Sequence, residues 1–194
     1  MKHGRFSDEP RAIWLNESGM DRRMRLLAAF RFTDPSGKVW DAPAESLVDG
    51  ASIPRALWSL VGSPYTGEYR RASVVHDIAC DRAGSNREER RAADRMFYRA
   101  CRAGGCSVRE SSLLYLGVRI GAILPDIPQW SPAKAVDNSG PRLQRMPEEE
   151  RLEADFVEAA RLVLDAAEAD DEFLIESRVD SALEAVTGRD VRSL

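Results

Sequence analysis

The sequence contains little histidine and cysteine and has no long apolar run. Its 194 residues include 2 histidines and 3 cysteines. An odd cysteine count does not suggest a disulfide scaffold and is typical of a reducing compartment. The longest apolar stretch, residues 113–124, contains Arg119 and is too short to cross a bilayer. Residues 1–12 are polar and charged, so we expect no secretion by a signal peptide.

Charge is unevenly distributed along the chain. Residues 141–194 carry 7 Lys and Arg against 15 Asp and Glu, whereas residues 1–140 carry 21 against 17. Because the net charge is −4, we expect no nucleic acid partner. An acidic amphipathic segment suits docking to a protein partner, and the alternative is a solvated helical hairpin packed on the body.

Local patterning predicts an α+β fold that is mainly α. Residues 24–33 and 38–41 are expected to form a β-hairpin around the turn Asp34-Pro35-Ser36-Gly37. Another strand is expected at 11–16, and residues 44–53 fit a strand or a loop. Helices are expected at 54–61, 68–82, 87–102 and 108–124, with Asn86 as a cap and Ser107 and Glu110 as a capping box.

The second half of the chain changes character after these helices. Residues 125–147 are rich in Pro, Ser, Asn and Gly, and a helical pattern returns over 148–186 with a break near Asp170 and Asp171. We therefore expect a core domain over 1–130, a linker over 131–147 and an acidic helical appendage over 148–194.

Helix geometry selects one candidate for imidazole chemistry. His3 lies in a polar segment, whereas His76 lies in the middle of a predicted helix. If the helices over 68–82 and 87–102 pack antiparallel around a loop centre near Gly84 and Ser85, His76 and Asp94 lie level. A carboxylate bound to one ring nitrogen leaves the other nitrogen to act as a base. The alternative is that Asp94 pairs with arginines on or near its own helix, namely Arg90, Arg91 and Arg95.

A second set of residues fits a hard cation. Asp77 follows His76 and points about 100° further round the helix, toward a neighbouring loop or surface. Asp49 and Gly50 could share calcium with Asp77, supported by backbone carbonyls and water. One histidine without paired cysteines makes a poor zinc site. The alternatives are a plain Asp-Gly turn and a surface His-Asp pair, and the cysteines are interpreted as small buried residues.

Two resemblances build on these residues. The chain resembles, over about residues 25–125, a domain family of unknown function found in phages and prophages. The residues that carry this resemblance are Asp49-Gly50-Ala51-Ser52-Ile53-Pro54-Arg55, Tyr69, Ala72, His76-Asp77, Arg91, Ala93-Asp94 and Phe97. The resemblance implies a protein that acts in the host cytoplasm or as part of a virion.

The order Asp-Gly-x-Ser, His-Asp and Asp-x-x-Phe also resembles the small bacterial and fungal secreted phospholipases A2. This resemblance implies that Asp49 and Asp77 bind calcium, His76 activates water and Asp94 orients the histidine. Two cysteine positions of those enzymes are occupied here by Ala51 and Ser73, and a tyrosine position by Cys80. The predicted helix over 54–61 also lengthens the spacing between Asp49 and His76.

The leading expectation is therefore a calcium-assisted ester hydrolase of phospholipase A2 type with a lipid or membrane surface as partner. The apolar face of the predicted helix over 108–124 could line an acyl slot, although core packing is the favoured interpretation. One alternative is a non-enzymatic virion, tail-associated or assembly protein with a structural His-Asp network. The other is a toxin or defence effector that the C-terminal segment 148–194 holds inactive.

Overall fold

Six short strands precede the helices. The computed structural model describes residues 2–15, 23–62, 66–123, 147–165 and 169–192. The strands are β1 (Arg5–Phe6), β2 (Ala12–Trp14), β3 (Met24–Leu26), β4 (Phe30–Thr33), β5 (Val39–Ala42) and β6 (Leu47–Val48). The helices are η1 (Arg55–Leu57), α1 (Trp58–Val61), α2 (Arg70–Ala83), α3 (Arg87–Gly104), α4 (Val108–Ile123), α5 (Pro147–Asp165) and α6 (Glu172–Thr187).

The strands form two small antiparallel sheets, in the orders β1-β4-β5 and β2-β3-β6. In β4, Phe30 and Phe32 are buried while Arg31 between them is exposed, as expected when one face of a sheet packs on helices. The β4–β5 hairpin confirms the predicted turn: the Asp34 carboxylate accepts hydrogen bonds from the backbone amides of Ser36 and Lys38 at 2.9 and 3.1 Å.

Two expectations about the first half need correction, and one strand, β1, was not predicted. The single strand over 24–33 is wrong, because β3 and β4 belong to different sheets. The backbone turns away between them, where the Leu27 amide donates to the Arg11 carbonyl. The segment 54–61 begins as a 3-10 turn and becomes α-helical only at Trp58. β1 had no distinctive pattern in the sequence, since a two-residue strand is too short to show alternation.

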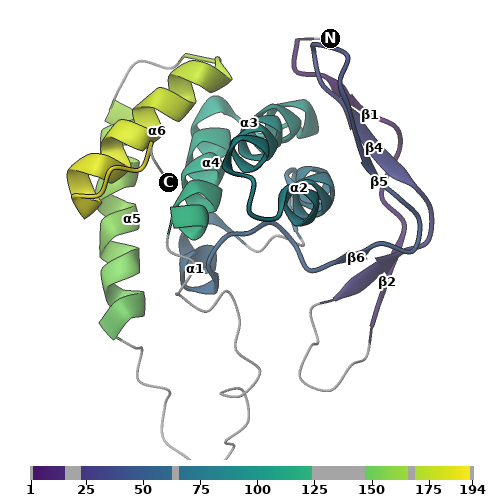
Figure 1. The fold of residues 1–194 in the computed structure, drawn as a ribbon, viewed down its shortest axis with the longest axis horizontal. Coiled ribbons are helices and arrows are strands. Elements are labelled where there is room, and N and C mark those ends of the chain that lie inside the picture. The colour runs from purple at the N-terminus through teal and green to yellow at the C-terminus, as the bar shows by residue number, and fades with distance from the viewer. Residues whose placement is uncertain (1, 16–22, 63–65, 124–146, 166–168, 193–194) are drawn as a thin grey trace, which may run out of the picture.

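Helices α2 and α3 form the antiparallel hairpin that the sequence predicts, and α2 packs on the β4–β5 sheet (Figure 1). The Asn86 side chain accepts from the Glu89 amide at the start of α3. At the start of α4, Ser107 and Glu110 form the expected reciprocal capping box. The layers in Figure 1 therefore run from the sheet through α2 and α3 to α4 and then to α5 and α6.

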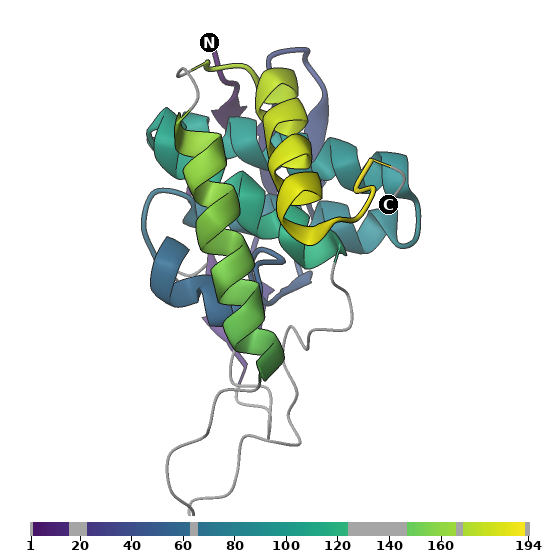
Figure 2. The same ribbon diagram turned by 90° about the vertical axis from the view of Figure 1, so that its left-hand side faces the viewer.

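The C-terminal helices α5 and α6 lie side by side across the helical layer (Figure 2). Asp171 caps α6 by accepting from the amides of Phe173 and Leu174, so the predicted break is confirmed. Both helices contribute to the same apolar core as α2–α4, through Leu152, Phe156, Ile175, Val179 and Leu183. Residues 131–146 of the expected linker lie outside the described residues.

The fold class is confirmed in its coarse form: a mainly helical chain with small antiparallel sheets near its N-terminus. None of the described helices is both long and apolar enough to span a bilayer. In α4, Leu114, Leu116, Val118 and Ile120 are at most 2% exposed, so this apolar face is packed in the core.

Candidate functional site

The α2–α3 hairpin brings the two predicted residues together. His76 Nε2 lies 2.8 Å from Asp94 Oδ1, and both side chains are 0% exposed. The alternative partner Arg90 is more distant, with Nε 3.8 Å from the same carboxylate oxygen. Arg91 and Arg95 turn away and bind acids on α6 instead. The histidine is therefore the principal α2–α3 partner of Asp94.

The pair is enclosed by further side chains. The Phe97 ring packs against the imidazole with 4.7 Å between ring centroids. Cys80 Sγ lies 3.3 Å from His76 Nε2 and 3.8 Å from Nδ1. His76, Cys80 and Asp94 thus place three ligand-type atoms within 4.8 Å of one another, all buried. The histidine has no open face in this conformation.

Burial and charge act in opposite directions on the pair. Burial alone would lower the pKa of His76, but the neighbouring Cys80 and Asp94 groups raise this pKa to about 10. Burial would raise the pKa of Asp94, but the hydrogen bond and charge of His76, together with Arg119, lower it. Each of the two residues therefore favours the charged form of the other in this enclosed site.

The charged network continues through α4. Arg119 is 2% exposed, and its Nη1 lies 3.3 Å from Asp94 Oδ2. Its Nη2 lies 3.5 Å from Asp180 Oδ1 on α6, an ion pair without hydrogen-bond geometry. Asp180 is also bound by Arg91 at 2.7 Å. The two buried carboxylates and the two buried basic side chains thus form a continuous series of contacts from α2 to α6.

On the adjacent face of α2, the chain places the predicted cation ligands together. The Asp49 backbone amide donates to Asp77 Oδ2 at 2.7 Å. Asp49 directly follows β6, and Gly50 turns the chain with a φ of 101°, a conformation that favours glycine. The sequence correctly predicted that Asp77 points toward a neighbouring loop, and this loop contains Asp49 and Gly50.

Two glycines of α4 make room for that loop. A Cβ built on Gly121 would lie 2.4 Å from the Ser52 carbonyl oxygen, and one on Gly117 would lie 3.3 Å from the Ile53 side chain. The loop therefore rests directly on the α4 backbone. This close approach keeps the residues that follow Asp49 at a fixed depth beside Asp77.

The residues present fit a hard cation in their chemistry. Burial, followed by the charge of Asp49, raises the pKa of Asp77 to about 7, and burial and Asp49 also raise the pKa of Asp81. Among the side chains that the structure describes, no lysine or arginine forms an ion pair with Asp77. Asp77 is thus a buried carboxylate next to another negative charge and without an ion-paired lysine or arginine among the described residues, a setting that suits calcium.

Three contributors were missed by sequence reasoning. Cys80 lies four residues after His76, and Asp81 lies four residues after Asp77. The helical i, i+4 spacing could therefore have placed Cys80 on the face of His76 and Asp81 on the face of Asp77. Arg119 was noted only as an interruption of an apolar run. A buried arginine requires carboxylate partners, and that requirement was the available signal. The second histidine, His3, lies 3.2 Å from Asp170 and takes no part in the His76 site.

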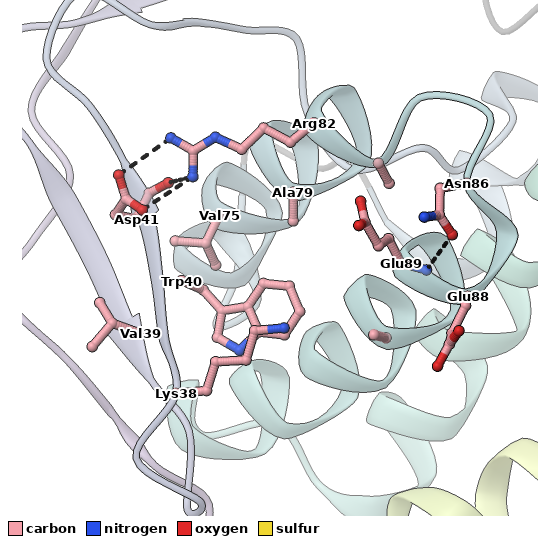
Figure 3. A pocket seen from close by; sticks show the side chains of 12 residues that line it. Lys38, Val39, Trp40, Asp41, Val75, Ala79, Arg82, Asn86, Glu88 and Glu89 are labelled. Carbon is pink, nitrogen blue, oxygen red and sulfur yellow. Dashed lines mark hydrogen bonds and ion pairs between the residues drawn. The ribbon is translucent and has the colours of Figure 1, made fainter.

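A separate groove lies between β5 and the α2–α3 hairpin (Figure 3). It has a volume of about 520 Å³, and the Lys38 ammonium sits 3.7 Å from the centre of the Trp40 ring. Arg82 pairs with Asp41 at its rim, as the dashed lines show. His76 is not among the residues that line this groove, because it points from α2 toward α3.

Comparisons match the segment that contains the site to a family model without a known function. Residues 24–118 match the family described as "Protein of unknown function (DUF1353)". The chain is 34% identical over 115 residues to uncharacterized protein y4jT of Sinorhizobium fredii (strain NBRC 101917 / NGR234), covering 59% of this chain and 33% of that protein. It is 37% identical over 105 residues to uncharacterized protein y4iH of the same strain, covering 52% of this chain and 43% of that protein.

The chain therefore spans less than half the length of either of these curated relatives. No solved structure matches it. The expected resemblance to a family of unknown function is confirmed. The matched segment includes Asp49, His76, Asp77 and Asp94 and ends one residue before Arg119.

Proposed function

We propose that this protein is a calcium-assisted ester hydrolase of phospholipase A2 type, with His76 as the base. Asp94 orients the histidine, and Asp49, Gly50 and Asp77 hold the cation. One observation supports this most: consecutive residues of α2 serve the two halves of the site. His76 Nε2 lies 2.8 Å from the buried Asp94 carboxylate, and the Asp77 carboxylate accepts a hydrogen bond from the Asp49 amide at 2.7 Å.

The chain's own residues would divide the work as follows. Asp94 occupies Nε2 of His76, which leaves Nδ1 to take a proton from the attacking water. Calcium, when bound, supplies positive charge beside the oxygen that becomes negative during ester cleavage. Asp49 and Asp77 hold that charge within reach of the histidine because they flank it on the loop and on α2.

Hydrolysis requires a change from the closed conformation. His76 is fully buried and carries a raised pKa, and a protonated ring cannot accept a proton. Water must reach Nδ1 and the ring must be neutral. Activity should therefore rise with pH, since the basic form of His76 becomes more abundant as pH increases.

The substrate class that we propose is an acyl ester of a membrane lipid, and the proposed setting is a phage or prophage. The substrate class follows from the resemblance of the Asp-Gly, His-Asp and Asp-x-x-Phe motifs to secreted phospholipases A2. The phage setting and a cytoplasmic or virion-associated location follow from the resemblance to the family of unknown function.

The first test is thermal unfolding with millimolar calcium and with a chelator. Calcium should raise the melting temperature of the wild type, because a ligand that binds only the native state stabilises it. Asp77→Asn should abolish that rise, while Glu88→Gln, which removes an exposed charge on α3, should retain it. Equal melting temperatures with calcium and chelator in the wild type would reject the calcium site.

The second test is hydrolysis of an acyl ester presented in phosphatidylglycerol vesicles. His76→Gln should reduce turnover by about 10²-fold or more, the usual contribution of a general base. Its circular dichroism spectrum should match that of the wild type. Equal turnover in the two proteins would reject His76 as the base.

A second candidate is a non-enzymatic virion or assembly protein with a structural His-Asp network. The complete enclosure of His76 favours it. Under this candidate His76→Gln lowers the melting temperature or impairs assembly, and the wild type cleaves no ester. The two experiments above therefore separate the candidates.

A further inference from the structure

The buried charges beyond Asp94 reach the C-terminal helix. Arg119 of α4 contacts Asp94 with Nη1 and faces Asp180 of α6 with Nη2, at 3.3 and 3.5 Å. The exposed fractions of these three side chains are 2% for Arg119, 0% for Asp94 and 5% for Asp180. Water cannot substitute for a missing partner at such depth, so each group relies on the others.

Asp94 and Asp180 lie next to different nitrogen atoms of the Arg119 guanidinium. Asp94 binds His76 through Oδ1 and Arg119 through Oδ2, so its rotation is fixed by contacts on both oxygens. Arg119 is in turn held from the far side by Asp180, which Arg91 anchors at 2.7 Å. Removing Asp180 leaves Arg119 with Asp94 as its one remaining carboxylate within ion-pair distance among the described residues.

We infer that Arg119 and Asp180 are positioning residues of the His76 site, so that α6 completes a site whose other parts lie on α2 and α3. This inference rests on the proposed function for its catalytic meaning. Without Asp180, Arg119 moves toward Asp94 and competes with His76 for its charge. The imidazole then loses its fixed hydrogen bond.

The chain contains a matched control for this inference. Glu176 lies one turn before Asp180 on the same helix and also binds α3, through Arg95 at 2.9 Å and Arg91 at 3.3 Å. Glu176 makes no ion pair with Arg119 among the described residues. Glu176→Gln and Asp180→Asn therefore each weaken the contact between α3 and α6, but only Asp180→Asn acts on Arg119.

The experiment is a ring 1H–15N spectrum of the full chain labelled at histidine, at constant pH. There are two histidines, so a His3→Gln variant assigns the His76 signals. The wild type should show a slowly exchanging, downfield Nε2 proton on His76. Asp180→Asn should shift this proton upfield or lose it to exchange, and Glu176→Gln should leave it unchanged.

Charge-retaining variants keep the inference testable if Asp180→Asn does not fold. Asp180→Glu should restore the wild-type signal, while Arg119→Lys should lose it, because one ammonium cannot reach both carboxylates as a guanidinium does. A wild-type His76 signal in Asp180→Asn or in Arg119→Lys would overturn the inference. Equal loss of the signal in Glu176→Gln and Asp180→Asn would also overturn it, since that result indicates general loosening of α6.

Failure of the proposed function would look different. If the wild type cleaves no ester but the His76 proton responds to Asp180→Asn as expected, the hydrolase proposal is wrong and the positioning inference stands. If the wild type cleaves ester, Asp180→Asn should lower kcat by about tenfold or more without a matching change in KM. Unchanged kcat would overturn the positioning role.

Discussion

His76 and Asp77 are neighbours in the chain, yet their surroundings have opposite electrostatic character. On the His76 side, buried charges of both signs alternate from His76 to Asp94, Arg119 and Asp180. On the Asp77 side, burial and the charge of Asp49 raise the pKa of both Asp77 and Asp81. The first arrangement stabilises the fold through pairing, whereas the second destabilises it and favours a cation. One helix thus carries a structural charge network and a candidate ligand site on adjacent faces.

The largest expected effect is on the paired side. Asp94→Asn would leave the His76 ring without its carboxylate partner and the Arg119 guanidinium with Asp180 alone, in a space that excludes water. Breaking one member of a buried charge network costs about 3–5 kcal/mol. Urea unfolding should therefore show a loss of that size in the free energy of unfolding. A loss below about 1 kcal/mol would mean that the remaining charged groups rearrange and compensate for the missing Asp94 charge.

Neutralising Asp77 should have the opposite sign. Burial and the charge of Asp49 raise the pKa of Asp77 from its ordinary value of 3.8 to about 7, so its charged form opposes folding once the pH exceeds the ordinary value. The cost grows between these two pH values and is complete above the higher one. Asp77→Asn should therefore raise the free energy of unfolding by on the order of 1–3 kcal/mol near pH 8 in chelator, and change it little below about pH 4.

Urea unfolding at the two pH values measures this effect, with Glu88→Gln as the control for loss of one negative charge. A lower free energy of unfolding for Asp77→Asn than for the wild type near pH 8 would contradict the prediction that the charge of Asp77 opposes folding. It would mean that the hydrogen bond from the Asp49 amide outweighs the repulsion between the carboxylates.

The smallest expected effect on stability is at Asp81, whose side chain is exposed. Solvent screens its charge, so Asp81→Asn should change the free energy of unfolding by no more than about 0.5 kcal/mol. It should still weaken calcium binding measured by titration calorimetry, because Asp81 lies within electrostatic reach of Asp49, whose charge together with burial raises the pKa of Asp81. Unchanged calcium affinity would restrict the ligands to Asp49, Gly50 and Asp77.

The two sides also differ in how far the sequence revealed them. The His76–Asp94 pair follows from equal spacing around a loop centre near Gly84 and Ser85, because an antiparallel helical hairpin has a nearly fixed register. The approach of Asp77 to a loop follows from the angle between consecutive helical residues. Asp180 could not be assigned in this way, since it lies 86 residues after Asp94 and depends on how α6 packs. Local rules predict contacts within a hairpin, whereas contacts between distant helices depend on the whole core.

Strand assignments failed for a related reason. The run over 24–33 has the composition of one strand, but its two halves pair with different partners, β2 and β6 for the first and β1 and β5 for the second. The amino-acid composition of a segment indicates that it can form a strand, but it does not indicate which strands pair with it. The helices were located better because caps such as Asn86 and Ser107 act within one turn.

Gly121 has an effect beyond its own helix. Since a methyl group there would overlap the Ser52 carbonyl oxygen, the absence of a side chain determines how deeply the Asp49 loop sits. The cation affinity that we propose for this loop would therefore be set partly by a residue that lies outside the ligand set, on α4. Evolution or an engineer could tune that affinity from α4, by the bulk of one position, while every carboxylate remained unchanged.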